Sequence, residues 1–386
     1  MPQFSAPQEL VDTIIDELQD DYLSLTSCSL VSRSFSFQTR PHLFRHIDLA
    51  GGPLSAKFHQ LTLSSPHIPT YVKDLTIFDN AFFEDRHAME ILRSLVDLGT
   101  IELRHSHVSS LPKVASALSN ISITSVVLSF TTFFSVSIFC ALMNRCFPGV
   151  RNLEMSNVLV PTITDADFAI PKRSCTMETL RIKLDDVNNQ ILRIIAEGAL
   201  GALTELHTLT TIGCPEGDAA PPFRKLLLLP SLRVLRLRNL QYGLSLPDPV
   251  PLLHLHTIVL NMICLQYHTH CVSPLLWLTS CLSMDPQKIS SVQHITIIYT
   301  VYQKHGDLPI ESDIMAWEAL DRLLSHPRMS ALKSFRVVVD GDSDHPEGTI
   351  FHPKTVIEDS CTYLRSRESL FTVQVVDRVD YDAFQL

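Results

Sequence analysis

The hexapeptide Leu-Arg-Val-Leu-Arg-Leu, residues 232–237, contains the pattern from which the fold of this chain is predicted. Its leucines stand at positions one, four and six, and Arg236 separates the last two. Alternation of apolar and polar residues with a period of two is typical of a β-strand that buries one face. The hexapeptide is therefore predicted to form a short strand with Leu235 and Leu237 directed into a core.

The same block, L-x-x-L-x-L with other apolar residues in places, recurs along most of the chain. Successive first positions lie 23–29 residues apart through the first eight blocks, and then 37 and 40 residues apart. A period of 20–29 residues is that of leucine-rich repeats, each of which adds one strand to a parallel sheet. The blocks are Val72/Leu75/Ile77, Leu98/Ile101/Leu103, Ile123/Val126/Leu128, Val150/Leu153/Met155, Met177/Leu180/Ile182, Leu203/Leu206, Leu232/Leu235/Leu237, Leu255/Ile258/Leu260, Val292/Ile295/Ile297 and Leu332/Phe335/Val337.

Helices are expected between these strands, and the alternation predicts an α/β fold with a parallel sheet and outer helices. A last strand is expected at 371–376, and the polar tail 377–386 is expected to cap the array. The pattern resembles irregular leucine-rich repeats without a clear asparagine ladder, and residues 206–209 break the alternation. A less regular α/β array is the alternative. The expected helices are 86–96, 111–118, 136–145, 188–197, 273–282, 312–324 and 354–364.

A different pattern occupies the first 48 residues. Ser5 and Gln8 are suited to begin a helix with Pro7 in its first turn. Apolar residues at steps of three and four then continue through Leu18, which predicts one face of a helix. Asp20 or Asp21 is expected to cap a second helix, and Pro41 is expected to end the helical run.

This stretch resembles an F-box followed by the exit sequence of fungal F-box proteins. The family pattern is Leu-Pro-x-Glu-Leu, Ile, Leu and Val-Ser-Arg-x-Trp/Phe, and one departure is Ala6 in place of the first Leu. The resemblance divides the chain into an F-box at 1–48 and a repeat region at 49–386. It is carried by Pro7, Glu9, Leu10, Ile14, Leu18, Leu23, Leu25, Val31, Ser32, Arg33 and Phe35.

The F-box resemblance implies a substrate receptor of an SCF-type ubiquitin ligase. The first domain would bind the Skp-type adaptor and through it a cullin, while the repeats would bind a protein target. Such a subunit is not catalytic and needs no cofactor. A scaffold that recruits no ligase is the alternative, and a hydrolase on a repeat scaffold is a further one. The residues expected to contact the adaptor are Pro7, Leu10, Ile14, Leu18, Leu25, Val31 and Phe35.

Composition limits the partners and the compartment. A formal net charge of −10 argues against binding to the phosphate backbone of nucleic acids. Nine cysteines without Cys-x-x-Cys pairs, and no signal peptide, predict reduced thiols in the cytosol or nucleus. Residues 121–143 are uncharged and long enough to span a bilayer. Their many hydroxyl residues favour a strand followed by a buried helix, and no membrane association is expected.

In a repeat array, the residues between and after the buried pair point to the face opposite the helices. This places Arg181, Lys183, Arg236 and Arg238 on one surface, flanked by Arg104 and Arg336. Such a stripe is suited to an acidic or phosphorylated segment of a target. The alternative is an ordinary solvated face, because Glu102 and Glu154 occupy equivalent positions and surface ion pairs are common.

Patterns that indicate catalysis or metal binding are scarce. The sequence has no Gly-x-Ser-x-Gly, no phosphate-binding Gly-rich loop and no His-Glu-x-x-His. The pairs 105/107, 254/256 and 268/270 are spaced like histidine ligands but do not supply four ligands for a structural zinc. Asp340, Asp342 and Asp344 imitate a calcium loop, but His345 and Phe351 replace its Gly and Glu. No metal site is predicted.

Overall fold

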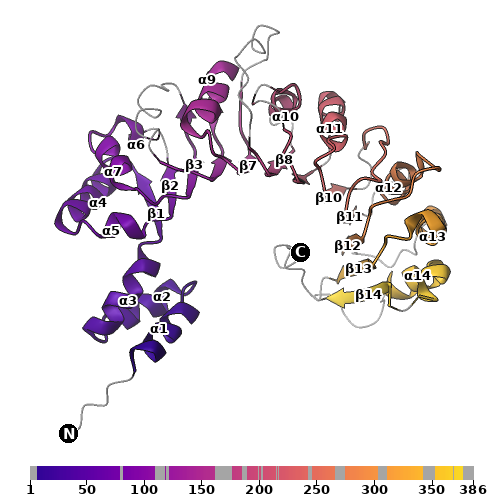
Figure 1. The fold of residues 1–386 in the computed structure, drawn as a ribbon, viewed down its shortest axis with the longest axis horizontal. Helices are drawn as coiled ribbons and strands as arrows, with labels where there is room; N and C mark the ends of the chain where they lie inside the picture. Colours follow the sequence, from indigo (N-terminus) through magenta and orange to yellow (C-terminus); the bar gives the residue numbers. More distant parts are fainter. Residues whose placement is uncertain are drawn as a thin grey trace. The chain divides into compact units, whose positions relative to one another are not determined.

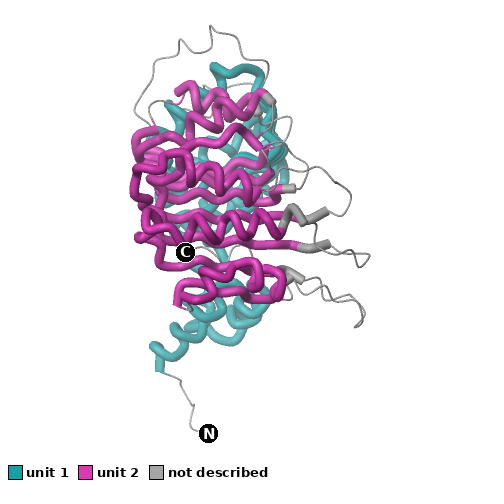
Figure 2. The backbone as a smooth tube through the Cα atoms, turned by 90° about the vertical axis from the view of Figure 1, so that its right-hand side faces the viewer, with its two compact units in different colours: residues 1–163 teal, residues 164–386 magenta. Residues whose placement is uncertain are grey.

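The computed structural model describes residues 7–78, 81–108, 118, 121–160, 176–184, 189–198, 200, 203–213, 215, 217–241, 246–265, 274–302, 311–341, 353–367 and 369–376. The chain divides into two compact units, residues 1–163 and 164–386, coloured separately in Figure 2. Each unit is described by itself below.

Unit 1 contains three N-terminal helices, α1 (Gln8–Glu17), α2 (Tyr22–Ser29) and α3 (Arg33–Leu43). Asp21 caps α2, because its carboxylate accepts a hydrogen bond from the Ser24 amide at 3.0 Å. Hydrogen bonds from Ser24, the hydroxyl first, also hold the pKa of Asp21 below its usual value. The hydroxyl of Ser32 caps α3 in the same way, accepting from the Phe35 amide at 3.3 Å. The predicted cap at Asp21 is confirmed.

The prediction that Pro41 ends the helical run is wrong. Pro41 lies inside α3, which continues to Leu43. A proline has no backbone N–H and therefore removes one hydrogen bond of the helix. Pro41 lies in the last turn of α3, so this loss affects only the end of the helix. The chain then enters strand β1 (His46–Ala50), so the domain boundary drawn at residue 48 falls within a strand.

Strands of unit 1 pair in parallel, in the order β1, β2 (Asp74–Phe78), β3 (Thr100–Arg104), β5 (Ser125–Ser129) and β7 (Asn152–Ser156). Position four of each block aligns with position four of the next, as with Leu75 and Ile101. These side chains are buried, as the pattern predicted. Strand β1 was missed, although Ile47 and Leu49 pair with Leu75 and Ile77 and belong to a block of the same kind.

The other elements of unit 1 follow or connect these strands. The predicted helix 86–96 is observed as the shorter helix α7 (Ala88–Ser94). The predicted helix 136–145 is observed as α9 (Val136–Ala141), which the π-helix η1 (Leu142–Cys146) continues. The predicted helix 111–118 lies outside the described residues except for Leu118. Helix α4 was missed, although Gly52 (φ 76°) and Pro53 mark its start. The elements are α4 (Pro53–Ser64), α5 (Ile68–Tyr71), α6 (Ala81–Glu84), β4 (His107–Val108), β6 (Thr132–Phe133), α7 (Ala88–Ser94), α9 (Val136–Ala141) and η1 (Leu142–Cys146).

The uncharged segment 121–143 contains β5, β6, α9 and the first two residues of η1. In the described part of the chain, no helix combines the length and the apolar character needed to cross a membrane.

Unit 2 also has parallel strands with helices on one side of them (Figure 1). The strands pair in chain order: β8 (Thr179–Lys183), β9 (Thr208–Ile212), β10 (Val234–Gln241), β11 (Thr257–Leu265), β12 (His294–Tyr302), β13 (Ser334–Gly341) and β14 (Phe371–Val376). Strand β14 has the predicted bounds. The helices are α10 (Asn189–Ala196), η3 (Gly217–Ala219), α11 (Ala220–Leu227), α12 (Pro274–Ser283), α13 (Glu311–Leu324), η4 (Pro327–Met329), α14 (Pro353–Ser360) and α15 (Thr362–Arg365).

One block of unit 2 was assigned to the wrong residues. Leu209 pairs with Leu235, so the block in β9 is Leu206/Leu209/Thr211 and not Leu203/Leu206. A threonine at position six hid the pattern, although its side chain is fully buried. Helix α11 was missed as well, although prolines 221 and 222 in its first turn are a typical start signal.

Repeats of both units turn at a left-handed residue two positions after the buried pair. His105, Phe130 and Asn157 have this conformation in unit 1, with φ between 49° and 52°. Gly213 (φ 97°) and Asn239 (φ 56°) have it in unit 2. A Cβ on Gly213 would lie 2.6 Å from the carbonyl oxygen of Leu184, so only glycine fits there.

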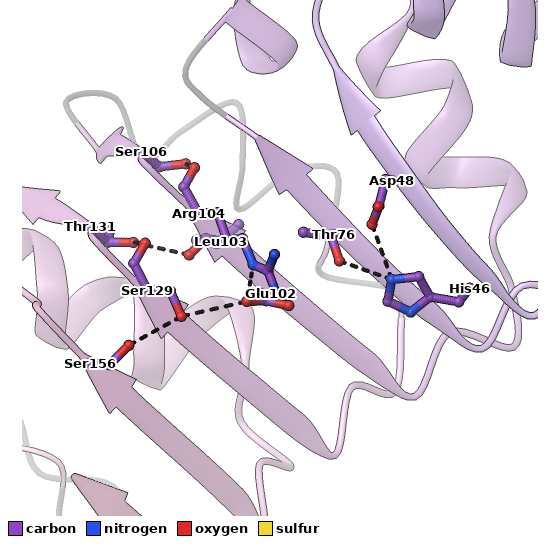
Figure 3. A network of polar contacts seen from close by, with 10 residues as sticks. All are labelled: His46, Asp48, Thr76, Glu102, Leu103, Arg104, Ser106, Ser129, Thr131 and Ser156. Carbon is purple, nitrogen blue, oxygen red and sulfur yellow. Dashed lines mark hydrogen bonds and ion pairs between the residues drawn. The ribbon is translucent and has the colours of Figure 1, made fainter. Parts of the chain in front are cut away.

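Hydroxyl side chains occupy the position after His105 and after Phe130, where leucine-rich repeats carry the asparagine of the ladder (Figure 3). Ser106 and Thr131 are fully buried there. The hydroxyl of Thr131 donates to the carbonyl of Leu103 in the preceding repeat at 3.1 Å, and that of Ser106 donates to the carbonyl of Arg104 at 3.1 Å. Buried carbonyl groups at the turns therefore receive hydrogen bonds without asparagine.

We predict that Thr131→Val lowers the free energy of unfolding by about 1–2 kcal/mol, because it leaves the Leu103 carbonyl without this donor. Urea denaturation of the full chain, followed by circular dichroism, measures the change. Thr132→Val is the matched control, since Thr132 is only half-buried. Equal stability of Thr131→Val and Thr132→Val would contradict the role of the hydroxyl.

Candidate interaction surfaces

The three N-terminal helices enclose a small core of their own. Val11, Ile15 and Leu25 are buried in it. Leu18, Cys28, Phe35 and Leu43 pack against these three side chains and are partly buried. The amphipathic pattern of α1 is therefore explained in part by packing within the module.

Other apolar side chains of the same helices remain on the surface. Leu10 is 52% exposed, Ile14 42% and Val31 68%. We use "apolar ridge" for the large, exposed apolar side chains of this module. They are Leu10, Ile14, Tyr22, Leu23, Leu30, Val31 and Phe37.

The structure separates the residues predicted to contact an adaptor into two groups. Pro7, Leu10, Ile14 and Val31 are exposed, whereas Leu18 and Phe35 are half-buried against the core. Leu25 is 1% exposed, and its assignment as a surface contact is therefore corrected to a core residue. Spacing alone could not separate Leu25 from Val31, because both continue the same apolar series. Tyr22, Leu30 and Phe37 were not predicted; their only sequence signal is their size.

Strand register in unit 2 brings the four predicted basic residues together. Arg181 of β8 and Arg236 of β10 pair with Thr210 of β9 from its two sides. Lys183 and Arg238 flank Ile212 in the same manner. Neighbouring strands are about 4.8 Å apart, so the two flanking residues of each row have backbones about 10 Å apart. We name these four residues the basic grid.

The arginines of the basic grid influence one another electrostatically. Burial lowers the pKa of Arg236, and the positive charges of Arg238 and Arg181 lower it further. An anion bound at this place would relieve that repulsion, and guanidinium groups match phosphate and carboxylate oxygens in pairs. The arrangement is chemically suited to a phosphoryl group or to neighbouring carboxylates.

On the corresponding face of unit 1, polar side chains form a network of hydrogen bonds and ion pairs (Figure 3). Arg104 donates to Glu102, and Glu102 in turn accepts a hydrogen bond from the Ser129 hydroxyl at 3.4 Å. The guanidinium of Arg104 also lies 5.5 Å from the centre of the Phe78 ring. The solvated-face interpretation therefore holds for Arg104. In unit 2, the flanking Arg336 donates to the side chain of Gln374.

A histidine in this network resembles part of a catalytic triad but lacks its geometry. Nε2 of His46 lies 3.0 Å from the Asp48 carboxylate and 3.3 Å from the Thr76 hydroxyl (Figure 3). A triad needs the carboxylate on one ring nitrogen and the hydroxyl on the other. Because both partners share Nε2, this arrangement cannot relay a proton from Thr76.

Thiols and the predicted histidine pairs provide little reactive chemistry among the described residues. Burial raises the pKa of Cys281 and of Cys361 to about 12, so these thiols stay protonated at neutral pH. His105 stacks on Phe130, with ring centres 4.9 Å apart. Burial first, and then Lys288 and Arg233, lower the pKa of His254. The pair 268/270 and residues 342 and 344 lie outside the described residues.

No protein-family model matches the sequence. No curated protein matches it either. Among solved structures, the chain is similar to an internalin from Listeria monocytogenes, with 12% identity, coverage of 98% of this chain and 94% of that chain, and a TM-score of 0.32. It is also similar to a leucine-rich-repeat protein of Leptospira interrogans, with 12% identity, coverage of 93% and 98%, and a TM-score of 0.28. The leucine-rich-repeat-like arrangement described above rests on strand register and repeat length.

We predict that Leu25→Asp unfolds the helical module, since an unpaired carboxylate in its core destabilises it by several kcal/mol. The double variant Leu10→Asp/Ile14→Asp should change stability by only about 0.5 kcal/mol per site, because both side chains are exposed. Limited proteolysis within residues 7–43 distinguishes the two cases. Comparable protection of Leu25→Asp and the double variant would contradict the division between core and ridge.

Proposed function

We propose that this protein is the substrate-recognition subunit of an SCF-type ubiquitin ligase. The N-terminal module would bind a Skp-type adaptor, and the repeats would bind a protein target. The observation that supports the proposal most directly is the exposure of Leu10, Ile14 and Val31, three residues of the F-box resemblance. These three side chains are exposed, whereas Val11, Ile15 and Leu25 of the same helices form a buried core.

Burial of the apolar ridge would supply the binding free energy for the adaptor. Covering one leucine or isoleucine side chain contributes about 1.5–3 kcal/mol before the entropy of association is subtracted. Several such side chains are needed to hold a partner, and the ridge offers seven. Helices presenting apolar anchors at steps of three and four residues are a common mode of recognition between proteins.

The repeats would contribute specificity through the basic grid. An acidic or phosphorylated segment of the target would accept hydrogen bonds from Arg181, Arg236 and Arg238. Proximity is then the whole contribution to the reaction, since a target lysine held near the ubiquitin-charged enzyme has a raised effective concentration. In this proposal the chain provides no reacting group.

A scaffold that recruits no ligase is the second candidate. The observation in its favour is Ala6, which stands where the F-box pattern has a leucine and removes one apolar contact. In that case the apolar ridge would bind a different helical or apolar partner, and the basic grid would keep its role in protein–protein interaction.

Co-expression with a Skp-type adaptor should give a stable one-to-one complex. Leu10→Asp/Ile14→Asp should abolish this complex, because both carboxylates would be desolvated at the contact. Leu63→Asp is the matched control, since Leu63 is a leucine of α4 that is 69% exposed outside the ridge. Size-exclusion chromatography with mass determination measures the complexes. Failure of the unmodified chain to bind the adaptor would favour the scaffold.

Arg236→Glu/Arg238→Glu should reduce capture of the target from native extract at least about tenfold, because it replaces charge-assisted donors by repelling carboxylates. Capture of the adaptor should stay constant and serves as the internal standard. Arg224→Glu/Lys225→Glu makes the same change of charge on helix α11 and should capture the target normally. Quantitative mass spectrometry compares the three chains. Unchanged capture by the grid variant would exclude the grid as the target site.

A further inference from the structure

Two histidines and a glutamate of unit 1 come together at the start of the repeat region. One ligand atom from each of His59, His87 and Glu90 lies within 4.8 Å of the other two. Nε2 of His59 is 2.6 Å from a carboxylate oxygen of Glu90, and the rings of His59 and His87 stack with centres 4.5 Å apart. The sequence analysis did not detect this group, because 28 residues separate the two histidines.

The packing of α4 against α7 and the hydrogen bonds of the Asp85 carboxylate hold these side chains in place. His59 lies on α4, whereas His87 precedes α7 and Glu90 lies in its first turn. Residues three apart on a helix lie on the same side of it, so His87 and Glu90 face His59 together. Asp85 links the two segments, because its carboxylate accepts the amide of His87 at 2.8 Å and that of Gly52 at 2.8 Å.

The donor set matches a known class of metal site. Two imidazoles and one carboxylate, with a fourth position left to water, are the protein ligands of many zinc centres. Ligand atoms around a tetrahedral zinc are about 3.3 Å apart, given bonds of about 2.0–2.1 Å. The three side chains would rotate to reach that separation and to direct their lone pairs at one ion, because the two rings are stacked before the ion binds. The carboxylate can make the largest adjustment, since the Glu90 side chain is 61% exposed and that of His59 only 13%.

We propose that His59, His87 and Glu90 form a binding site for a divalent transition metal, with Zn²⁺ as the ion that fits its donors best. The metal would take the place of the direct contact between His59 and Glu90 and would join α4 to α7. Such a bridge stabilises the folded chain, because the three ligands are not held together when the chain is unfolded. The site is independent of the apolar ridge and of the basic grid.

Replacement of Arg86 tests the proposed role of His87, because it is expected to strengthen zinc binding rather than weaken it. Nε of Arg86 donates to Nε2 of His87 at 2.9 Å, so the lone pair of this His87 nitrogen is directed at the guanidinium group. A metal using that lone pair must displace the guanidinium, and the positive charge beside it opposes binding. Arg86→Gln should therefore tighten zinc binding severalfold. Weaker binding by this variant would contradict the proposed geometry.

Titration of the metal-free full chain with Zn²⁺ in a calorimeter should show one saturable site, and Zn²⁺ should raise the melting temperature. Co²⁺ should bind in place of Zn²⁺ and give the visible absorption that is typical of four-coordinate Co²⁺. His87→Gln and Glu90→Gln should each weaken binding at least about tenfold, since even partners of metal ligands contribute that much. Glu90→Gln is safe for the fold, because Glu90 is exposed.

His67→Gln is the matched control, since His67 is an exposed histidine of the same unit that is not in the cluster. It should bind Zn²⁺ like the unmodified chain. Absence of saturable binding by the unmodified chain would overturn the proposal. An affinity that both His87→Gln and Glu90→Gln leave unchanged would overturn it as well, because the metal would then be bound by other residues.

Discussion

The alignment of buried residues at positions four and six across neighbouring parallel strands is the constraint on which the rest of this structure depends. Because consecutive residues of a strand face opposite sides, aligned buried residues force aligned rows on the other face. Arg181, Thr210 and Arg236 form such a row in unit 2. A slip of one residue would bury the arginines and expose the leucines. The core therefore determines where the basic grid lies, although no residue of the grid is part of that core.

Much of this architecture is predictable from sequence, because a buried strand needs a period-two pattern and a repeat needs a constant length. The bounds of β14 and the blocks of most strands were found on that basis. The errors share a physical cause. At each such position the residue type differs from the repeat pattern, but its side chain is still buried or still makes the hydrogen bond that the position requires. A buried Thr211 takes the place of a leucine in β9, and Ser106 and Thr131 take the place of ladder asparagines. Packing and hydrogen bonding constrain such positions more loosely than a consensus suggests.

The candidate sites were less predictable than the fold, since they depend on which neighbour each side chain contacts. Leu25 and Val31 belong to one apolar series, yet the first is buried and the second is exposed. Three short helices can enclose only a few side chains, so part of any long apolar series must remain outside. Which part does so is decided by how the helices pack. The cluster of His59, His87 and Glu90 depends on packing between α4 and α7 in the same way, because spacing along the chain brings His87 near Glu90 but does not bring His59 near either of them.

Charge distribution allows an acidic protein to present a local basic surface. The chain has a formal net charge of −10, and that overall charge disfavours long polyanions such as nucleic acids. At physiological ionic strength, charges are screened over about 8 Å, so a bound group responds mainly to its immediate neighbours. The two flanking residues of each row of the basic grid have backbones about 10 Å apart, which is close to that range. In the proposed function, a short anionic segment would respond mainly to the cations of the grid, while an extended polyanion would also respond to the net negative charge of the chain.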